Sequence, residues 1–191
     1  MEEQKKYKKK FKKKEYPKKS AYDMYDDKGY DLKKPKQNKY SAQSYVIYLL
    51  ARRDYSVKEL QQKLKEKEYP LEESEQAIEW AINSKYQSDE RYASGRTRYR
   101  SETYGNRRIK MELEDKGIQT DIIEQVMEEI ETEEERASKL MLDYNRRKNL
   151  NGEWDLKVKE KAFRYFISKG FSYDSIKSAW RKVFIEKDFY N

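Results

Sequence analysis

Cysteine and histidine are both absent from this chain of 191 residues. Without thiols the chain can form no disulfide bond and no thiolate metal site, and without imidazole the usual zinc sites and serine–histidine–aspartate triads have no material. Proline is scarce, and the six glycines are dispersed rather than gathered into a loop that could cradle phosphate. We therefore expect no enzymatic activity, no cofactor and no bound metal.

Long apolar runs are lacking as well. No run approaches the ~18 residues that a membrane-spanning helix needs, and the polar, lysine-rich beginning of the chain lacks the apolar stretch of a secretory signal. We therefore expect a cytoplasmic protein that makes no contact with membranes. Charged residues make up 42% of the chain and apolar residues 36%, so any hydrophobic core must be thin and divided among small units.

The net charge of +8 comes from residues 1–40, which hold 15 lysines and seven acidic residues. All 13 arginines lie in the remainder, where positive and negative charges cancel. Because the segment has so few aliphatic side chains, we expect residues 1–40 to be disordered. It is either an arm that attracts polyanions, with Tyr7, Phe11 and Tyr16 able to stack on exposed bases, or a solubilising tail without a defined partner.

A helical pattern recurs three times after residue 40. Its copies contain the apolar pairs Leu60/Leu64, Ile109/Leu113 and Ala162/Phe166, each followed by a break and a second periodic stretch. The copies are offset by 49 and 53 residues, a spacing typical of tandem units that stack and share a core. We therefore predict an all-α protein, an elongated array of three tandem three-helix repeats at residues 41–87, 88–131 and 132–191.

Several residues after position 40 are typical of helix starts and helix ends. We predict helix N-caps at Ser56, Ser88, Thr120, Thr132 and Ser172, with capping boxes that Glu59 and Glu135 complete. Pro70 suits a first helical turn, Gly117 and Gly170 suit left-handed helix stops, and Asn149–Asp155 is expected to be a longer loop. The side chains expected in the core at equivalent positions are Leu64, Leu113 and Phe166 and, one helix later, Ile78, Met127 and Trp180.

Acidic residues are densest between residues 121 and 135. Helical spacing spreads them around the outside of a helix and into a cap, so we interpret the group as a solvated face and not as a two-metal site. Its members are Asp121, Glu124, Glu128, Glu129, Glu131, Glu133, Glu134 and Glu135.

A basic group in the middle copy is the best candidate for a binding surface. Arginine forks suit carboxylate or phosphate recognition, and Tyr92, Tyr99 and Tyr104 interleave with them. The alternative is a solvated basic face that the acidic group balances. The candidate residues are Arg91, Arg96, Arg98, Arg100, Arg107, Arg108 and Lys110.

Two stretches of the chain resemble the RecX family of regulatory proteins. The first is Tyr48–Ser56 continued by Glu59-Leu60 and Lys63-Leu64, and the second is Ser88–Ala93 followed by Tyr104-Gly105, Ile109–Leu113 and Lys116–Ile118. The resemblance covers about residues 41–187. In the first repeat Glu68-Tyr69-Pro70 replaces the glycine of the other two, so we expect that turn to be built differently.

The resemblance implies three helix-turn-helix-like repeats in a curved molecule. It also implies a regulator that binds RecA and the RecA–single-stranded DNA filament and limits filament growth. RecA's ATP hydrolysis, strand exchange and co-protease activity would fall as a result. We expect the protein to be a monomer. The alternatives are a helical array that binds single- or double-stranded DNA directly without sequence preference, and a helical scaffold for another protein.

Overall fold

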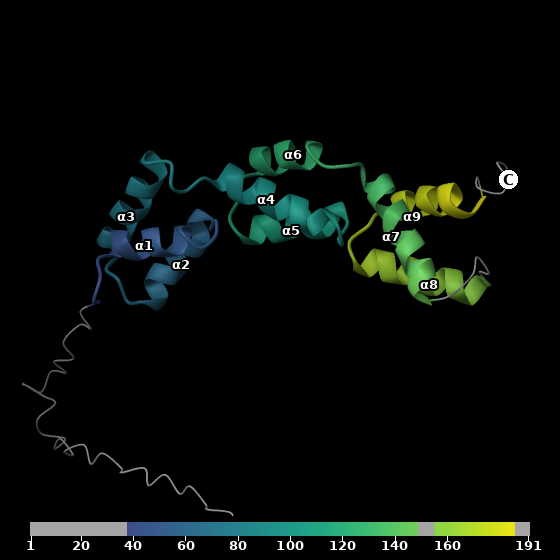
Figure 1. Ribbon diagram of the computed structural model, residues 1–191, viewed down its shortest axis with the longest axis horizontal. Coiled ribbons are helices and arrows are strands. Elements are labelled where there is room, and N and C mark those ends of the chain that lie inside the picture. The colour runs from purple at the N-terminus through teal and green to yellow at the C-terminus, as the bar shows by residue number, and fades with distance from the viewer. Residues whose placement is uncertain (1–37, 149–154, 186–191) are drawn as a thin grey trace, which may run out of the picture. The chain divides into compact units, whose positions relative to one another are not determined.

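The computed structural model describes residues 38–148 and 155–185 (Figure 1). These residues form nine α-helices and a final π-helical turn, Arg181–Ile185, and contain no strand. The predicted arm lies almost entirely outside the described residues, as does most of the predicted loop at Asn149–Asp155. The helices are α1 (Ala42–Leu50), α2 (Val57–Glu66), α3 (Leu71–Asn83), α4 (Asp89–Ser101), α5 (Asn106–Asp115), α6 (Thr120–Glu128), α7 (Glu133–Lys148), α8 (Leu156–Ser168) and α9 (Tyr173–Trp180).

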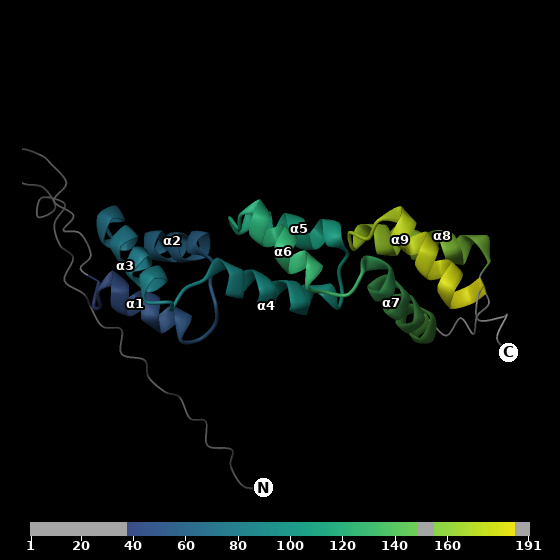
Figure 2. The ribbon, with the colours of Figure 1, turned by 90° about the horizontal axis from the view of Figure 1, so that it is seen from above.

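The helices group in threes, which confirms the predicted repeats. In repeat 1 (α1–α3), repeat 2 (α4–α6) and repeat 3 (α7–α9), the first helix packs against the third (Figures 1 and 2). Each repeat has its own hydrophobic cluster. Leu64, Leu113 and Phe166 are fully buried at equivalent places in the three clusters. Ile78 and Trp180 are buried as predicted, and Met127 is partly buried against its cluster.

Most predicted helix starts are confirmed. The hydroxyls of Ser56, Ser88 and Ser172 each accept the N–H three residues later, and Thr132 and Glu135 exchange the two hydrogen bonds of a capping box. Two predictions were wrong by one residue. Thr120 was expected to be the N-cap of α6, but Gln119 occupies that position. Pro70 was expected in the first turn of α3, but it is the N-cap of that helix. Thr120 and Leu71 are therefore the first helical residues.

The turn after the second helix has one geometry in all three repeats. Gly117 and Gly170 have φ values of 78° and 89°, as predicted for left-handed helix stops. Glu68 adopts the same conformation at φ 60°, and the N–H of the following residue bonds the carbonyl five residues back in each repeat. The expectation of a differently built first turn was therefore wrong. The Gly117 turn lies against the side chain of Lys58 in repeat 1, and the Gly170 turn lies against Arg108 in repeat 2.

Candidate interaction surface

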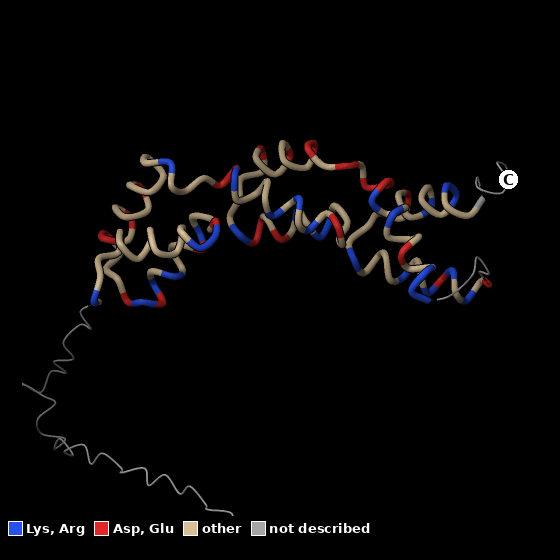
Figure 3. Tube along the Cα trace, in the orientation of Figure 1, with Lys and Arg blue, Asp and Glu red and all other residues tan. Residues whose placement is uncertain are grey.

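The predicted basic residues lie on two adjacent helices of repeat 2. Arg91, Arg96, Arg98 and Arg100 belong to α4, while Arg107, Arg108 and Lys110 belong to the first half of α5. Acidic positions are frequent along α6 and at the end of α5, close to these cations in the chain (Figure 3). The seven side chains therefore differ in whether a carboxylate of the protein already holds them.

Glu112 on α5 binds two of the α4 arginines at once. Its Oε1 accepts hydrogen bonds from both Nε and Nη2 of Arg96, the former at 2.8 Å, and its Oε2 accepts one from Nε of Arg100 at 2.7 Å. Burial of this carboxyl favours its neutral form, but the hydrogen bonds from Arg100 and Arg96 outweigh that and lower the pKa of Glu112. Arg96 and Arg100 therefore tie α4 to α5 within repeat 2.

The other two α4 arginines also face carboxylates. Arg91 donates to Asp54 of repeat 1 at 2.8 Å and to the backbone oxygen of Tyr86 at 2.6 Å. Arg98 lies 3.8 Å from Glu129, just after α6. This agrees in part with the alternative of a basic face balanced by acidic residues. The neutralising residue that the sequence analysis missed is Glu112, whose pairing with Arg96 and Arg100 on α4 has no local signal in the sequence.

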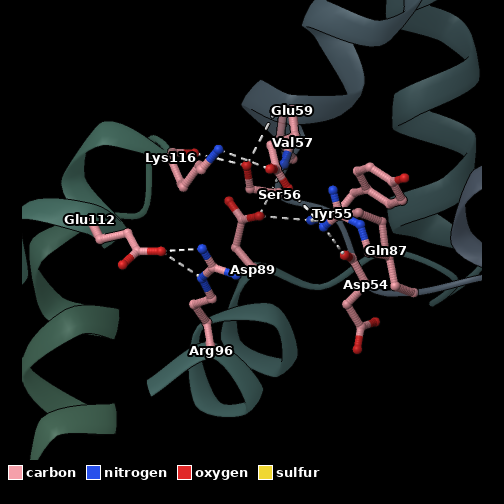
Figure 4. A network of polar contacts seen from close by, with 11 residues as sticks. Asp54, Tyr55, Ser56, Val57, Glu59, Gln87, Asp89, Arg96, Glu112 and Lys116 are labelled. Atoms are coloured by element: carbon pink, nitrogen blue, oxygen red, sulfur yellow. Dashed lines mark hydrogen bonds and ion pairs between the residues drawn. The ribbon is translucent and has the colours of Figure 1, made fainter. Parts of the chain in front are cut away.

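Polar contacts join repeat 1 to repeat 2 around the start of α2 (Figure 4). The Ser56 hydroxyl donates to the backbone oxygen of Lys116 at 2.8 Å, and the Val57 N–H donates to Asp89 at 3.1 Å. Burial raises the pKa of Asp89, although hydrogen bonds from Val57 and Gln87 oppose the shift. The turn that ends at Gly117 therefore packs against the beginning of the helix that Ser56 caps.

Glu59 has a second role in this junction besides the predicted capping box. The backbone N–H of Glu59 donates to the Ser56 hydroxyl, as a capping box requires. Its carboxylate, however, pairs with Lys116 at 3.0 Å and Arg53 at 3.4 Å. A hydrogen bond from the Ser56 backbone also reaches this carboxylate, so the glutamate serves both the capping box and the contact between repeats.

The junction between repeats 2 and 3 repeats this arrangement with different residues. Glu133 at the start of α7 accepts the Asn106 N–H at 2.6 Å, the Ser172 N–H at 3.2 Å and the Ser175 hydroxyl at 2.9 Å. The buried Arg136 donates to the Tyr104 carbonyl at 2.7 Å and to the Asn106 side chain. The prediction that the whole acidic group faces water was therefore wrong for Glu133, because α5 and α9 both begin beside it.

Of the seven predicted cations, three have no ion pair among the described residues: Arg107, Arg108 and Lys110. All three are exposed. The Arg108 guanidinium lies 5.8 Å from the centroid of the Tyr104 ring, which also has Arg100 at 4.4 Å and Lys169 at 4.7 Å. We call Arg107, Arg108 and Lys110 the α5 basic surface. Exposed guanidinium groups of this kind can bind an external carboxylate or phosphate.

The interleaved tyrosines have three different environments. Tyr92 is buried in the core of repeat 2, and burial, helped by the nearby Glu59, raises its pKa to about 12. Tyr99 is exposed, and Tyr104 is half-buried beneath the cations. Only Tyr99 and Tyr104 can therefore line a contact with a partner.

The described residues contain no group of three or more acidic side chains placed to hold a metal ion. Within the same residues, no helix is long and apolar enough to cross a membrane.

Known proteins match both the sequence and the fold. Residues 42–80 match the family model of the first three-helix domain of RecX, and residues 88–127 match that of the second. The regulatory protein RecX of Actinobacillus pleuropneumoniae serotype 5b is 43% identical over 136 residues, which cover 71% of this chain and 87% of that protein. The regulatory protein RecX of Haemophilus ducreyi is 40% identical over 134 residues, which cover 70% and 86%.

A solved structure agrees with the fold. The crystal structure of RecX from Lactobacillus salivarius aligns with a TM-score of 0.64 at 22% identity, and the alignment covers 74% of this chain and 94% of that one. The sequence match to the regulatory protein RecX of Actinobacillus pleuropneumoniae covers most of this chain and most of that protein. It agrees with the resemblance inferred from Tyr48–Ser56 and Ser88–Ala93. The chain belongs to the RecX family of regulatory proteins.

Proposed function

We propose that this protein is a non-enzymatic regulator that binds RecA and the RecA–single-stranded DNA filament. By occupying the filament it limits filament growth, and RecA's ATPase, strand-exchange and co-protease activities fall as a consequence. The observation that carries the proposal is the family membership, with 43% identity to a regulatory protein RecX over 87% of that protein.

The α5 basic surface is our candidate for the contact with the filament. Its three cations are exposed and have no carboxylate partner among the described residues, whereas the four α4 arginines are held by Asp54, Glu112 and Glu129. A cation that already has an intramolecular partner gives up that ion pair when it binds another anion. Arg107, Arg108 and Lys110 bear no such cost, so they support binding to filament phosphates or carboxylates best.

A pull-down of RecA filaments tests this surface. The double variant Arg107→Glu and Arg108→Glu should bind filaments at least tenfold more weakly at the same salt concentration. Glutamates in the first turn suit the helix dipole, so α5 should stay folded, and circular dichroism checks this. The matched control is Arg146→Glu with Arg164→Glu, the same charge change at two exposed arginines of repeat 3. Equal loss in both variants would assign binding to net charge and remove the α5 surface.

Direct, sequence-unspecific binding to single- or double-stranded DNA is the second candidate. It is favoured by the 15 lysines of residues 1–40 together with the unpaired α5 cations. Each phosphate that a cation neutralises releases counterions, so the logarithm of affinity should fall linearly with the logarithm of salt concentration. Deleting residues 1–37 should flatten that slope while leaving the described helices intact. An unchanged slope would exclude the lysine-rich segment from DNA binding.

A further inference from the structure

A tyrosine-lined groove in repeat 1 has no part in the contacts described above. Its volume is about 500 Å³, and it lies where residues 38–40 meet α1 and the end of α2. The residues that define it are Lys39, Tyr40, Tyr45, Tyr48, Lys67 and Tyr69.

Three of the tyrosine rings form a stacked ladder. The ring centroids of Tyr45 and Tyr48 are 6.4 Å apart with an interplanar angle of 18°, and those of Tyr45 and Tyr69 are 5.9 Å apart at 26°. Tyr45 and Tyr48 are one helical turn apart on α1, so they share a face. The Tyr69 hydroxyl donates to the backbone oxygen of Tyr40 at 2.8 Å and fixes the fourth tyrosine beside the ladder.

Two rings of the groove are accessible. Tyr48, at one end of the ladder, is 54% exposed, and Tyr40, beside the ladder, is 62% exposed. Tyr45 and Tyr69 pack against the core of repeat 1, to which α1 contributes Ala42, Val46 and Leu49. Tyr48 and Tyr40 do not belong to that packing, so the core does not explain these two exposed rings.

Cations surround the rings, and among the described residues no carboxylate lines the groove. The ammonium of Lys39 is 5.4 Å from the Tyr40 centroid, and that of Lys67 is 6.0 Å from the Tyr45 centroid. Arg52 lies 5.2 Å from the Tyr48 centroid and donates to the Tyr48 hydroxyl at 2.8 Å. A ligand that fits must therefore offer flat π faces and negative charge together.

We propose that this groove binds unstacked bases of a single nucleic-acid strand. Bases stack on the outer rings, Tyr48 and Tyr40, and the adjoining phosphates lie near Lys39, Lys67 and Arg52. Every base has a π face, so the groove accepts bases without regard to sequence. The site lies in repeat 1, apart from the α5 basic surface, and its test contains no RecA, so either proposal can fail without the other.

The lysine-rich segment joins the described chain at Asn38, beside the groove. Its lysines add attraction to any polyanion, so phosphate binding alone does not report on the groove. The test must separate stacking on bases from attraction to phosphates.

Fluorescence anisotropy with labelled oligonucleotides makes that separation. The probes are an oligothymidylate and an abasic strand of equal length, both measured with the full chain at fixed salt. The native chain should bind the oligothymidylate more tightly than the abasic strand. Tyr48→Ala should weaken oligothymidylate binding about tenfold, as loss of one stacked base predicts, and leave abasic binding unchanged. Tyr48→Phe keeps the ring and should retain affinity.

Tyr173→Ala is the matched control, because Tyr173 is a comparably exposed tyrosine (59%) on α9, outside the groove. Equal affinity of the native chain for both probes would overturn the proposal, and so would equal loss in the Tyr48→Ala and Tyr173→Ala variants. A Tyr48-dependent preference for an acidic peptide over both strands would overturn it in favour of a protein ligand. An oligouridylate of the same length then distinguishes DNA from RNA as the strand bound.

Discussion

Gly170 of repeat 3 lies directly against Arg108 of repeat 2. A Cβ atom at Gly170 would come within 2.6 Å of the Arg108 Cβ and 2.7 Å of its backbone nitrogen, and φ of Gly170 is 89°. Beside this contact, the N–H groups of Gly105 and Arg107 donate to the backbone oxygens of Lys169 and Gly170 at 3.1 and 3.2 Å. The same junction therefore joins two repeats and fixes the end of α5 that carries the exposed cations.

Substitution Gly170→Ala should destabilise the protein by more than about 1 kcal/mol, because alanine is strained at positive φ and the backbone of Arg108 leaves no room for its methyl group. Urea unfolding measures the change. Gly95→Ala is the control: Gly95 lies within α4 with nothing within 4 Å of the added methyl group, and alanine there should stabilise by about 0.5–1 kcal/mol. If both variants have the same unfolding midpoint, the junction does not need glycine.

The fold was largely predictable because its signals are local. Apolar spacing around Leu64, Leu113 and Phe166, together with the serine caps, identified the helices, and the recurrence of that pattern identified the repeats. The turn at Glu68 was not predictable, because its conformation matches Gly117 and Gly170 without a glycine. The tertiary contacts of the glycine turns, with Lys58 at Gly117 and with Arg108 at Gly170, are likewise not reported by the local sequence.

Glu133 should make the stability of the protein depend on pH. Burial favours its neutral form, but hydrogen bonds from Asn106, Ser172 and Ser175 prevail and hold the pKa of Glu133 below the ordinary 4.5. The unfolded state therefore binds this proton more readily than the folded state. The stabilisation is present above pH 4.5 and is lost as pH falls through the folded-state pKa. Glu133→Gln should lower stability at pH 7 and flatten the decline below pH 4.5 in urea unfolding.

Asp89 should have the opposite effect, which provides an internal comparison. Its folded-state pKa is raised by burial, so its contribution to stability grows as pH falls through that pKa. Asp89→Asn should therefore steepen the net loss of stability in acid. If the Glu133→Gln and Asp89→Asn variants changed the loss of stability below pH 4.5 in the same direction, the opposite pKa shifts of Glu133 and Asp89 would be contradicted.

Glu112→Gln should destabilise repeat 2 by about 1–3 kcal/mol, since it leaves two arginines without their carboxylate. Urea unfolding at pH 7 measures the loss. Glu114→Gln, at an exposed position of the same helix, should change stability by less than about 0.5 kcal/mol. Equal effects at the two positions would mean that the Arg96–Glu112–Arg100 contacts add no stability.

The candidate surface was less predictable than the fold. The sequence located all seven basic residues on the two helices that carry them, but only the packing of α4 against α5 shows that Glu112 holds Arg96 and Arg100. Likewise, Tyr69 stacks on Tyr45 because the turn after α2 meets α1, a contact between residues far apart in the chain. Pairings of this kind depend on tertiary structure and have no local signal.

Titration of this protein against the DNA-dependent ATPase of RecA tests the central claim most directly. The native chain should suppress ATP hydrolysis at or below equimolar amounts, and the Arg107→Glu, Arg108→Glu variant should require at least tenfold more protein. The Arg146→Glu, Arg164→Glu variant should act like the native chain. Undiminished hydrolysis with excess native protein that still binds DNA would contradict the account and favour a direct DNA-binding role.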